Sequence, residues 1–257
     1  HYEANPFPVV MITFWFICCH FCLWIVHLAA ACDCSTAKVF ILAGQSNMVG
    51  MGSIEHLSKL LRGDDTHDEY APYWNETIQD WVERDDVYCK FDDQLGKLTV
   101  GFGAPQHFGP ELGFGWVLGD DYDCPCRKPI FLLKTAWGGR DLAIDFRPPS
   151  SGKGNYSGVH PSKYGWEYRQ MISDTLQTLG NLTNLVPVYE PSMGYRIEGF
   201  VWFQGWNDMI SLPKVQEYEF NLANLIRDVR DDLDSPEMAV VVGGMGQKGV
   251  NATGRGA

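Results

Sequence analysis

Ser46 is the residue whose surroundings best fit nucleophilic chemistry. It lies in Gly44-Gln45-Ser46-Asn47, directly after the apolar run at residues 38–43 (KVFILA). A short apolar run that stops at glycine predicts a buried strand followed by a sharp turn. A serine after such a turn projects from the edge of a sheet, where its hydroxyl can attack a carbonyl carbon and its N–H can face the carbonyl oxygen.

Two later segments offer the hydrogen-bond donors that ester hydrolysis needs. Gly139, in residues 136–140 (AWGGR), has no side chain, so its N–H can approach a reacting atom closely. Asn207, in residues 205–208 (GWND), carries an amide donor. Each donor aimed at the oxyanion is worth roughly 3 to 4 kcal/mol of barrier in serine hydrolases. The sequence therefore predicts Ser46 as the nucleophile and Gly139 and Asn207 as oxyanion-hole residues.

The neighbours of these residues are predicted to bind substrate. The predicted substrate-binding residues are Gln45, Arg140, Gln204 and Trp206. Trp137, Trp202 and Trp206 follow or end predicted strands and could offer apolar faces to a sugar ring, although Trp202 fits a core position better.

Each segment alone also fits an ordinary structural role. A Gly-x-Ser at a strand end is common, Gly138-Gly139 fits a simple turn, and Asn207-Asp208 fits a helix cap. The occurrence of all three segments, each after a predicted strand, favours a catalytic site. Met48 replaces the second glycine of a Gly-x-Ser-x-Gly elbow, so the pattern is not that of the α/β-hydrolases.

The elements that must position these residues follow an alternating order. Continuous apolar runs predict buried parallel strands at residues 38–43, 129–134, 198–204 and 238–243. Apolar residues at three- and four-residue spacing predict helices over residues 168–179, including Ile172 and Leu176, and over residues 215–233, including Val215.

Alternating strands and helices imply right-handed crossovers and an α/β fold. We expect a three-layer α/β/α sandwich with a flavodoxin-like parallel sheet, whose ligands bind at the carboxyl ends of the strands. Residues 53–115 are rich in loops and are expected to form a long excursion over the edge of the sheet.

The segment around Ser46 resembles a conserved segment of a known family. Residues 38–52 (KVFILAGQSNMVGMG) are similar to the first block of the SGNH hydrolases and, within them, of the sialate O-acetylesterase-like domain, carbohydrate esterase family 6. The match continues at residues 108–116 (FGPELGFGW), 134–142 (KTAWGGRDL) and 199–208 (GFVWFQGWND). The resemblance covers residues 38 to about 244 and implies the SGNH hydrolase fold.

The resemblance also implies roles for single residues. The family's nucleophile is the serine of Gly-Gln-Ser-Asn, which corresponds to Ser46, and Gly139 and Asn207 fall in the second and third oxyanion blocks. Trp206 stands where many members carry a glutamate, so the subfamily and the substrate stay open.

The family's catalytic Asp and His lie in an Asp-x-x-His block after the last strand. The last histidine of this chain is His160, which precedes the last predicted strand. Residues 64–67 (DDTH) have the same spacing but follow Ser46 too closely, and His107 and His160 lie in loops that fit surface positions. The expectation is that residues 35–257 form one domain that is incomplete at its C-terminus.

The N-terminal region predicts entry into the secretory route. Residues 9–32 are almost entirely apolar and end in Ala-Ala-Ala-Cys, which fits a signal peptide or an N-terminal membrane anchor within residues 1–34. Five cysteines outside this stretch allow at most two disulfides, and Asn-x-Ser/Thr sequons begin at Asn75, Asn155, Asn181 and Asn251. A secreted or anchored glycoprotein facing the extracellular or lumenal side is expected.

The composition of the chain limits the classes of ligand that we expect it to bind. The formal net charge of −12 argues against nucleic acid and permits a neutral substrate such as a sugar ester. No metal or organic cofactor is implied, because the Cys-x-Cys pairs lack the spacing of a zinc site. The oligomeric state stays open.

Three functions remain. The first is a carbohydrate O-acetylesterase acting on acetylated polysaccharide or sialic acid. The second is a carbohydrate-binding pseudoenzyme of the same fold. The third is an esterase for lipid or aryl esters.

Overall fold

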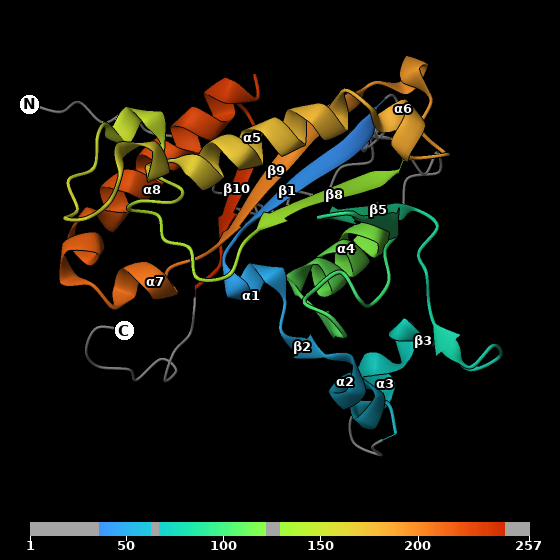
Figure 1. Ribbon diagram of the computed structural model, residues 1–257. Helices are drawn as coiled ribbons and strands as arrows, with labels where there is room; N and C mark the ends of the chain where they lie inside the picture. The colour runs from blue at the N-terminus through green and yellow to red at the C-terminus, as the bar shows by residue number, and fades with distance from the viewer. Residues whose placement is uncertain (1–35, 63–66, 122–128, 245–257) are drawn as a thin grey trace, which may run out of the picture. The chain divides into compact units, whose positions relative to one another are not determined.

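The computed structural model describes residues 36–62, 67–121 and 129–244 (Figure 1). Residues Asp33–Ala257 form one compact unit. The predicted leader at residues 9–32, the sequon at Asn251, residues 64–66 and every cysteine except Cys89 lie outside the described residues. Within the described ranges, no helix has both the length and the apolar character needed to cross a membrane.

A six-stranded sheet forms the centre of this unit. Its strands, in spatial order, are β10 (Ala239–Val242), β9 (Tyr195–Phe203), β1 (Ala37–Gly44), β8 (Ile130–Ala136), β5 (Val87–Phe91) and β6 (Gln94–Lys97). All neighbouring strands are parallel except β5 and β6, which form an antiparallel pair at the edge. The four predicted strands are therefore present as β1, β8, β9 and β10.

Helices cover both faces of the sheet (Figure 1). On one face, α5 (Trp166–Leu179) and α8 (Leu212–Asp232) pack on alternate residues of the strands, such as Val39 and Ile41 of β1. On the other face, α1 (Ser46–Val49) and α4 (Pro110–Asp121) pack on the intervening residues, such as Phe40 and Leu42. The predicted three-layer α/β/α architecture is confirmed.

Shorter elements connect this framework. They are α2 (Ile54–Leu60), α3 (His67–Tyr70), α6 (Leu182–Leu185), α7 (Trp206–Met209), the 3₁₀ turns η1 (Ala71–Tyr73), η2 (Pro149–Ser151), η3 (Pro161–Lys163) and η4 (Pro191–Met193), and the paired short strands β2 (Gly52–Ser53) with β7 (His107–Phe108) and β3 (Trp74–Asn75) with β4 (Asp80–Trp81).

The expectation for residues 53–115 needs correction. This region does reach the edge of the sheet, but it also contributes β5, β6 and the start of α4 to the framework. Two members of the predicted helical stripes are also exposed. Leu176 is exposed because the buried face of α5 instead uses Met171, Thr175 and Thr178, and Val215 is exposed because the buried residues of α8 begin only at Asn221.

Candidate active site

The three predicted site segments leave the sheet side by side. Gly44, the last residue of β1, pairs with Ala136 of β8 on one side and with Phe203 of β9 on the other. Two hydrogen bonds continue this alignment beyond the strands, from the Trp137 N–H to the Gly44 carbonyl at 3.2 Å and from the Gln45 N–H to the Phe203 carbonyl at 3.3 Å. The loops that carry Ser46, Gly139 and Asn207 therefore start from one edge of the sheet.

Gly44 allows the sharp turn that presents Ser46. A Cβ atom at this position would lie 2.2 Å from the Phe203 carbonyl oxygen, so only glycine fits. Ser46 follows as the first residue of α1, with Gln45 at the N-cap. A first-turn N–H has no intrahelical acceptor, so the Ser46 N–H can serve a ligand. The Ser46 side chain is half-buried.

Gln45 joins the first loop to the third. Its side chain is 2% exposed, and its Oε1 accepts hydrogen bonds from Gln204 Nε2 at 3.0 Å and from the N–H groups of Gly205 and Asn207, both at 3.3 Å. A buried carbonyl with three donors fixes the backbone on which Asn207 sits.

Asp208 joins the third loop to the second. Its buried carboxylate accepts the N–H groups of Leu142 at 2.9 Å and Ala143 at 3.0 Å, and Gln204 Nε2 at 2.7 Å. Burial raises the pKa of Asp208 to about 6, although these hydrogen bonds oppose the shift. Sequence reasoning treated this aspartate only as a possible helix cap, and its position directly after Asn207 was the one available signal.

Gly139 and Asn207 meet directly. The Asn207 side-chain amide donates a hydrogen bond to the Gly139 carbonyl oxygen, and Gly139 has a φ of 72°, in the region that favours glycine. An amide nitrogen carries a second hydrogen, so Asn207 keeps one donor for a ligand. The structure thus brings the two predicted oxyanion residues together, while their catalytic roles stay predictions.

The predicted substrate-binding residues divide into two groups. Gln45 and Gln204 are buried, and their amides make the contacts between loops; Gln204 also donates to the Arg140 carbonyl at 3.0 Å. Arg140 forms ion pairs with Glu167 at 2.9 Å and Asp145 at 3.6 Å, and Trp206 is exposed at the start of α7. The buried glutamines position the loops, and contact with substrate stays a prediction for all four residues.

The tryptophans and the histidines also have defined places. Trp202 is a core residue, which confirms the expectation that it fits a core position better than a sugar-binding one. Trp137 is half-buried. His107 Nδ1 donates to the Pro105 carbonyl at 2.7 Å, and His160 Nδ1 accepts the Ser162 N–H at 3.3 Å. Both rings are thus bonded within their own turns.

A buried ion pair that sequence reasoning missed supports the first loop. Lys134 of β8 and Glu111 of α4 lie 2.6 Å apart with fully buried side chains. Lys134 Nζ also donates to the Val49 carbonyl at 2.7 Å and to the Phe102 carbonyl, while Glu111 accepts the Gly109 N–H at 2.7 Å. Burial raises the pKa of Glu111 and lowers that of Lys134, and in each case the partner's charge opposes the shift. The pair ties the end of α1 to the sheet.

Comparison with known proteins agrees with this arrangement. The family model of a carbohydrate esterase, sialic acid-specific acetylesterase, matches residues 36–255. Comparison with curated protein sequences gives no significant match.

Solved structures share the fold at low sequence identity. A protein from Arabidopsis thaliana is 17% identical, with a TM-score of 0.51 over 82% of this chain and 76% of that chain. NanS is 12% identical, with a TM-score of 0.50 over 81% of this chain and 67% of that chain. On the evidence of the family model, the chain belongs to the carbohydrate esterase family of sialic acid-specific acetylesterases.

Proposed function

We propose that this protein is a serine ester hydrolase that removes O-acetyl groups from carbohydrates. The observation that carries the proposal is that β8, β1 and β9 end at paired residues. The loops of Gly139, Ser46 and Asn207 therefore begin at the same edge of the sheet. The Gln45 and Asp208 hydrogen bonds hold these loops in place before substrate arrives, and such preorganisation is the main source of electrostatic stabilisation in catalysis.

In the proposed mechanism, Ser46 Oγ attacks the acetyl carbonyl carbon while a general base takes the hydroxyl proton. The negative charge that forms on the carbonyl oxygen is held by the Ser46 N–H, the Gly139 N–H and the Asn207 amide. The sugar hydroxyl leaves with the proton, and water then hydrolyses the acetyl-serine to acetate. We propose a histidine as this general base, as in the family's Asp-x-x-His block.

The proposal is tested by acetate release from acetylated xylan and from O-acetylated sialic acid. We expect Ser46→Ala to lower the rate at least 10³-fold, since loss of the nucleophile leaves only binding and the oxyanion donors. Ser192→Ala is a matched control, because Ser192 is exposed in η4, next to the amino-terminal ends of β1 and β9. Undiminished acetate release by Ser46→Ala would contradict the mechanism.

The two alternative functions, a carbohydrate-binding pseudoenzyme and a lipid or aryl esterase, predict different results in these assays. A carbohydrate-binding pseudoenzyme binds sugar and releases no acetate. An esterase for lipid or aryl esters cleaves p-nitrophenyl acetate or a long-chain ester but not the acetylated sugars.

We also propose that the protein acts on the extracellular or lumenal side. Two of the predicted sequon asparagines, Asn155 and Asn181, are exposed, as glycan attachment requires. Mass spectrometry of protein made in secreting cells tests this, and unmodified Asn155 and Asn181 in a protein retained in the cytosol would contradict it.

A further inference from the structure

The proposed nucleophile, Ser46, stands on a helix that is too short to hold its own position. α1 is a single turn that begins at Ser46 and ends at Val49. A helix of this length has too few internal hydrogen bonds to be stable alone, so contacts at its two ends decide where it lies. At its start, Gln45 Oε1 accepts the N–H of Asn207 in the third loop. Its end is held by a buried ion pair.

Lys134 holds the end of α1 directly. Its Nζ donates to the Val49 carbonyl at 2.7 Å, to the Phe102 carbonyl, and to Glu111 Oε2 at 2.6 Å. An ammonium group has three donors, and these three acceptors use all of them. The Nζ also lies 4.5 Å from the centre of the Phe91 ring. The side chain is fully buried, so water does not compete for these contacts.

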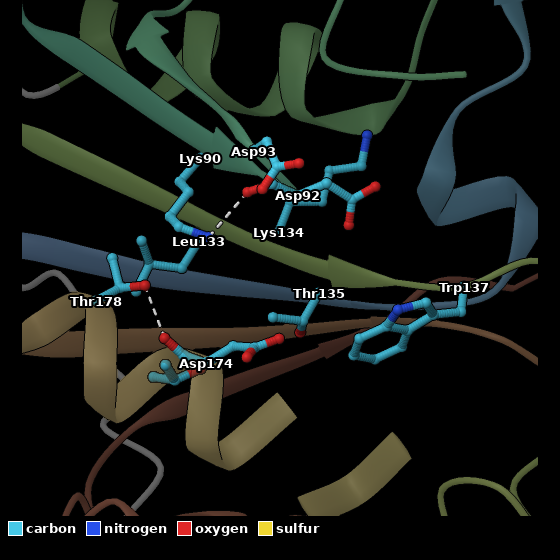
Figure 2. Close-up of a pocket in the computed structure, with 10 residues that line it drawn as sticks. Lys90, Asp92, Asp93, Leu133, Lys134, Thr135, Trp137, Asp174 and Thr178 are labelled. Carbon is cyan, nitrogen blue, oxygen red and sulfur yellow. Dashed lines mark hydrogen bonds between the residues drawn. The ribbon is translucent and has the colours of Figure 1, made fainter. Parts of the chain in front are cut away.

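Figure 2 shows the direction in which Lys134 leaves the sheet. Its side chain lies on the side of β8 opposite to Thr135, because successive residues of a strand point to opposite faces. Thr135 lies on the side of Asp174 in α5, whereas Lys134 shares its face with Leu132 and Ala136. The ion pair therefore lies in the layer of the sandwich that contains α1 and α4.

Glu111 holds the residue that follows the helix. Its Oε1 accepts the Gly109 N–H at 2.7 Å, and the Gly109 backbone packs against Gly50. A Cβ atom at Gly50 would lie 2.5 Å from the Gly109 Cα, and Gly50 has a φ of 95°, so this contact requires glycine. The Gly50 N–H in turn donates to the Ser46 carbonyl at 3.0 Å. Three successive contacts thus connect the carboxylate to the residue that carries the hydroxyl.

The ion pair makes directed contacts that an apolar pair of similar size cannot make. Replacing both charged residues by apolar ones costs far less stability than removing one of them. The same change leaves the Val49 carbonyl and the Gly109 N–H without these partners, so the end of α1 is free to shift. A misplacement of about 1 Å at a reacting group can slow a reaction by about 10²-fold. The effect of the pair on position can therefore be separated from its effect on stability.

We infer that Lys134 and Glu111 are positioning residues for Ser46, because they fix the end of α1 and thereby the direction from which the Ser46 hydroxyl attacks. Neither residue contacts substrate, since both side chains are fully buried. The inference rests on the proposed function and deepens it, because it names residues outside the three loops on which the rate of attack depends.

The test measures the reactivity of Ser46 in the double variant Glu111→Leu with Lys134→Met, which leaves no buried charge alone. One readout is acetate release from acetylated xylan. The other is the rate at which an alkyl fluorophosphonate labels Ser46, followed by mass spectrometry. We expect kcat and the labelling rate to fall about tenfold or more, while KM stays within about twofold because the groups that contact substrate are unchanged. Circular dichroism should show a folded protein at the assay temperature.

The double variant Arg84→Met with Asp86→Leu is the matched control. These two side chains are 2.8 Å apart and largely buried. Asp86 stands directly before β5, where its carbonyl accepts the Ile130 N–H at 2.9 Å, so the pair lies at the amino-terminal ends of β5 and β8, away from α1. We expect kcat and the labelling rate of this variant to stay within about twofold of the native values. An equal loss of reactivity in both double variants, or unchanged reactivity in Glu111→Leu with Lys134→Met, would overturn the inference.

The two proposals can fail separately. Labelling of Ser46 that depends on the ion pair, without acetate release by the native protein, would refute the acetylesterase and leave the positioning role. Acetate release that depends on Ser46 but is equally fast in Glu111→Leu with Lys134→Met would refute the positioning role and leave the acetylesterase. Absence of labelling of Ser46 in the native protein would refute both.

Discussion

At the residue scale, Gly139 combines a left-handed backbone with an exposed position in its loop. Its φ of 72° is costly for any residue with a Cβ, whereas Gly138 beside it has no positive φ and open space around it. We predict that Gly139→Ala lowers the free energy of unfolding by about 1–2 kcal/mol and lowers kcat for acetate release, because the N–H turns away from the oxyanion.

Gly138→Ala is the matched control for this prediction, and we expect it to change neither quantity appreciably. Denaturant unfolding and acetate release, measured on both variants, check the prediction. Identical behaviour of the two alanine variants would show that the backbone of Gly139 carries no special role.

At the element scale, the Glu111–Lys134 pair connects α4, β8 and the end of α1. Because neither side chain reaches solvent, removing one partner leaves a buried charge alone. We predict that Lys134→Met lowers the free energy of unfolding by about 3–5 kcal/mol. The exposed pair of Glu55 and Lys59, 2.7 Å apart on α2, is the control, and Lys59→Met should lower the free energy of unfolding far less than Lys134→Met does.

The double variant Glu111→Leu with Lys134→Met should be more stable than the sum of the single variants predicts, because both charges are then absent. A cost for Lys134→Met as small as that for Lys59→Met would contradict this view of the ion pair.

Asp208 gives a prediction about pH at the same scale. Its pKa of about 6 in the folded protein lies above the ordinary value of 3.8, so the folded state binds this proton more tightly than the unfolded state. The stability that Asp208 contributes is therefore fully present below about pH 4 and declines as the pH rises to about 6. We predict that the unfolding free energy of the native protein, minus that of Asp208→Asn, falls between pH 4 and pH 6 and is level above pH 7.

Denaturant unfolding of both proteins across this range checks the prediction, and a difference that rises with pH would contradict it. At neutral pH we also expect Asp208→Asn to be less stable by about 1–3 kcal/mol, because one backbone N–H of Leu142 or Ala143 loses its acceptor.

At the scale of the whole molecule, net charge bears on substrate choice. With a formal charge of −12, the protein repels anionic substrates over distances that salt shortens from about 30 Å at 0.01 M to about 10 Å at 0.1 M. We predict that kcat/KM for an acetylated sialic acid rises severalfold between these ionic strengths, while kcat/KM for a neutral acetylated oligosaccharide stays constant. Equal salt dependence of the two substrates would contradict the prediction.

Much of the fold was predictable because β1, β8 and β9 each contain a short apolar run, at residues 39–43, 130–133 and 199–203. β5 was missed because its five residues lie between the acidic pairs Asp85-Asp86 and Asp92-Asp93. α4 was missed because it contains Gly113, Gly115 and Gly119, which disfavour helices. Two of these glycines allow close packing: a Cβ at Gly115 would lie 2.4 Å from a Leu98 methyl group, and one at Gly119 would lie 2.4 Å from Arg84 Nη2.

The sequence predicts the main residues of the candidate site but not the hydrogen bonds that hold its loops together. Ser46, Gly139 and Asn207 each follow a strand, and that order is visible in the chain. The contact of Gln45 with Asn207 joins residues more than 160 positions apart, and it depends on the register of β1 with β9. No local pattern encodes such a contact.

The proposed mechanism requires that one hydroxyl and three hydrogen-bond donors surround a single carbonyl oxygen. The most direct test is a crystal structure of the protein after reaction with a phosphonate ester, whose tetrahedral phosphorus on Ser46 mimics the transition state. We predict a phosphoryl oxygen about 2.7–3.1 Å from the Ser46 N–H, the Gly139 N–H and the Asn207 amide, as the distances of oxyanion holes require. An adduct whose oxygen points away from Gly139 and Asn207, or the absence of any adduct on Ser46, would contradict it.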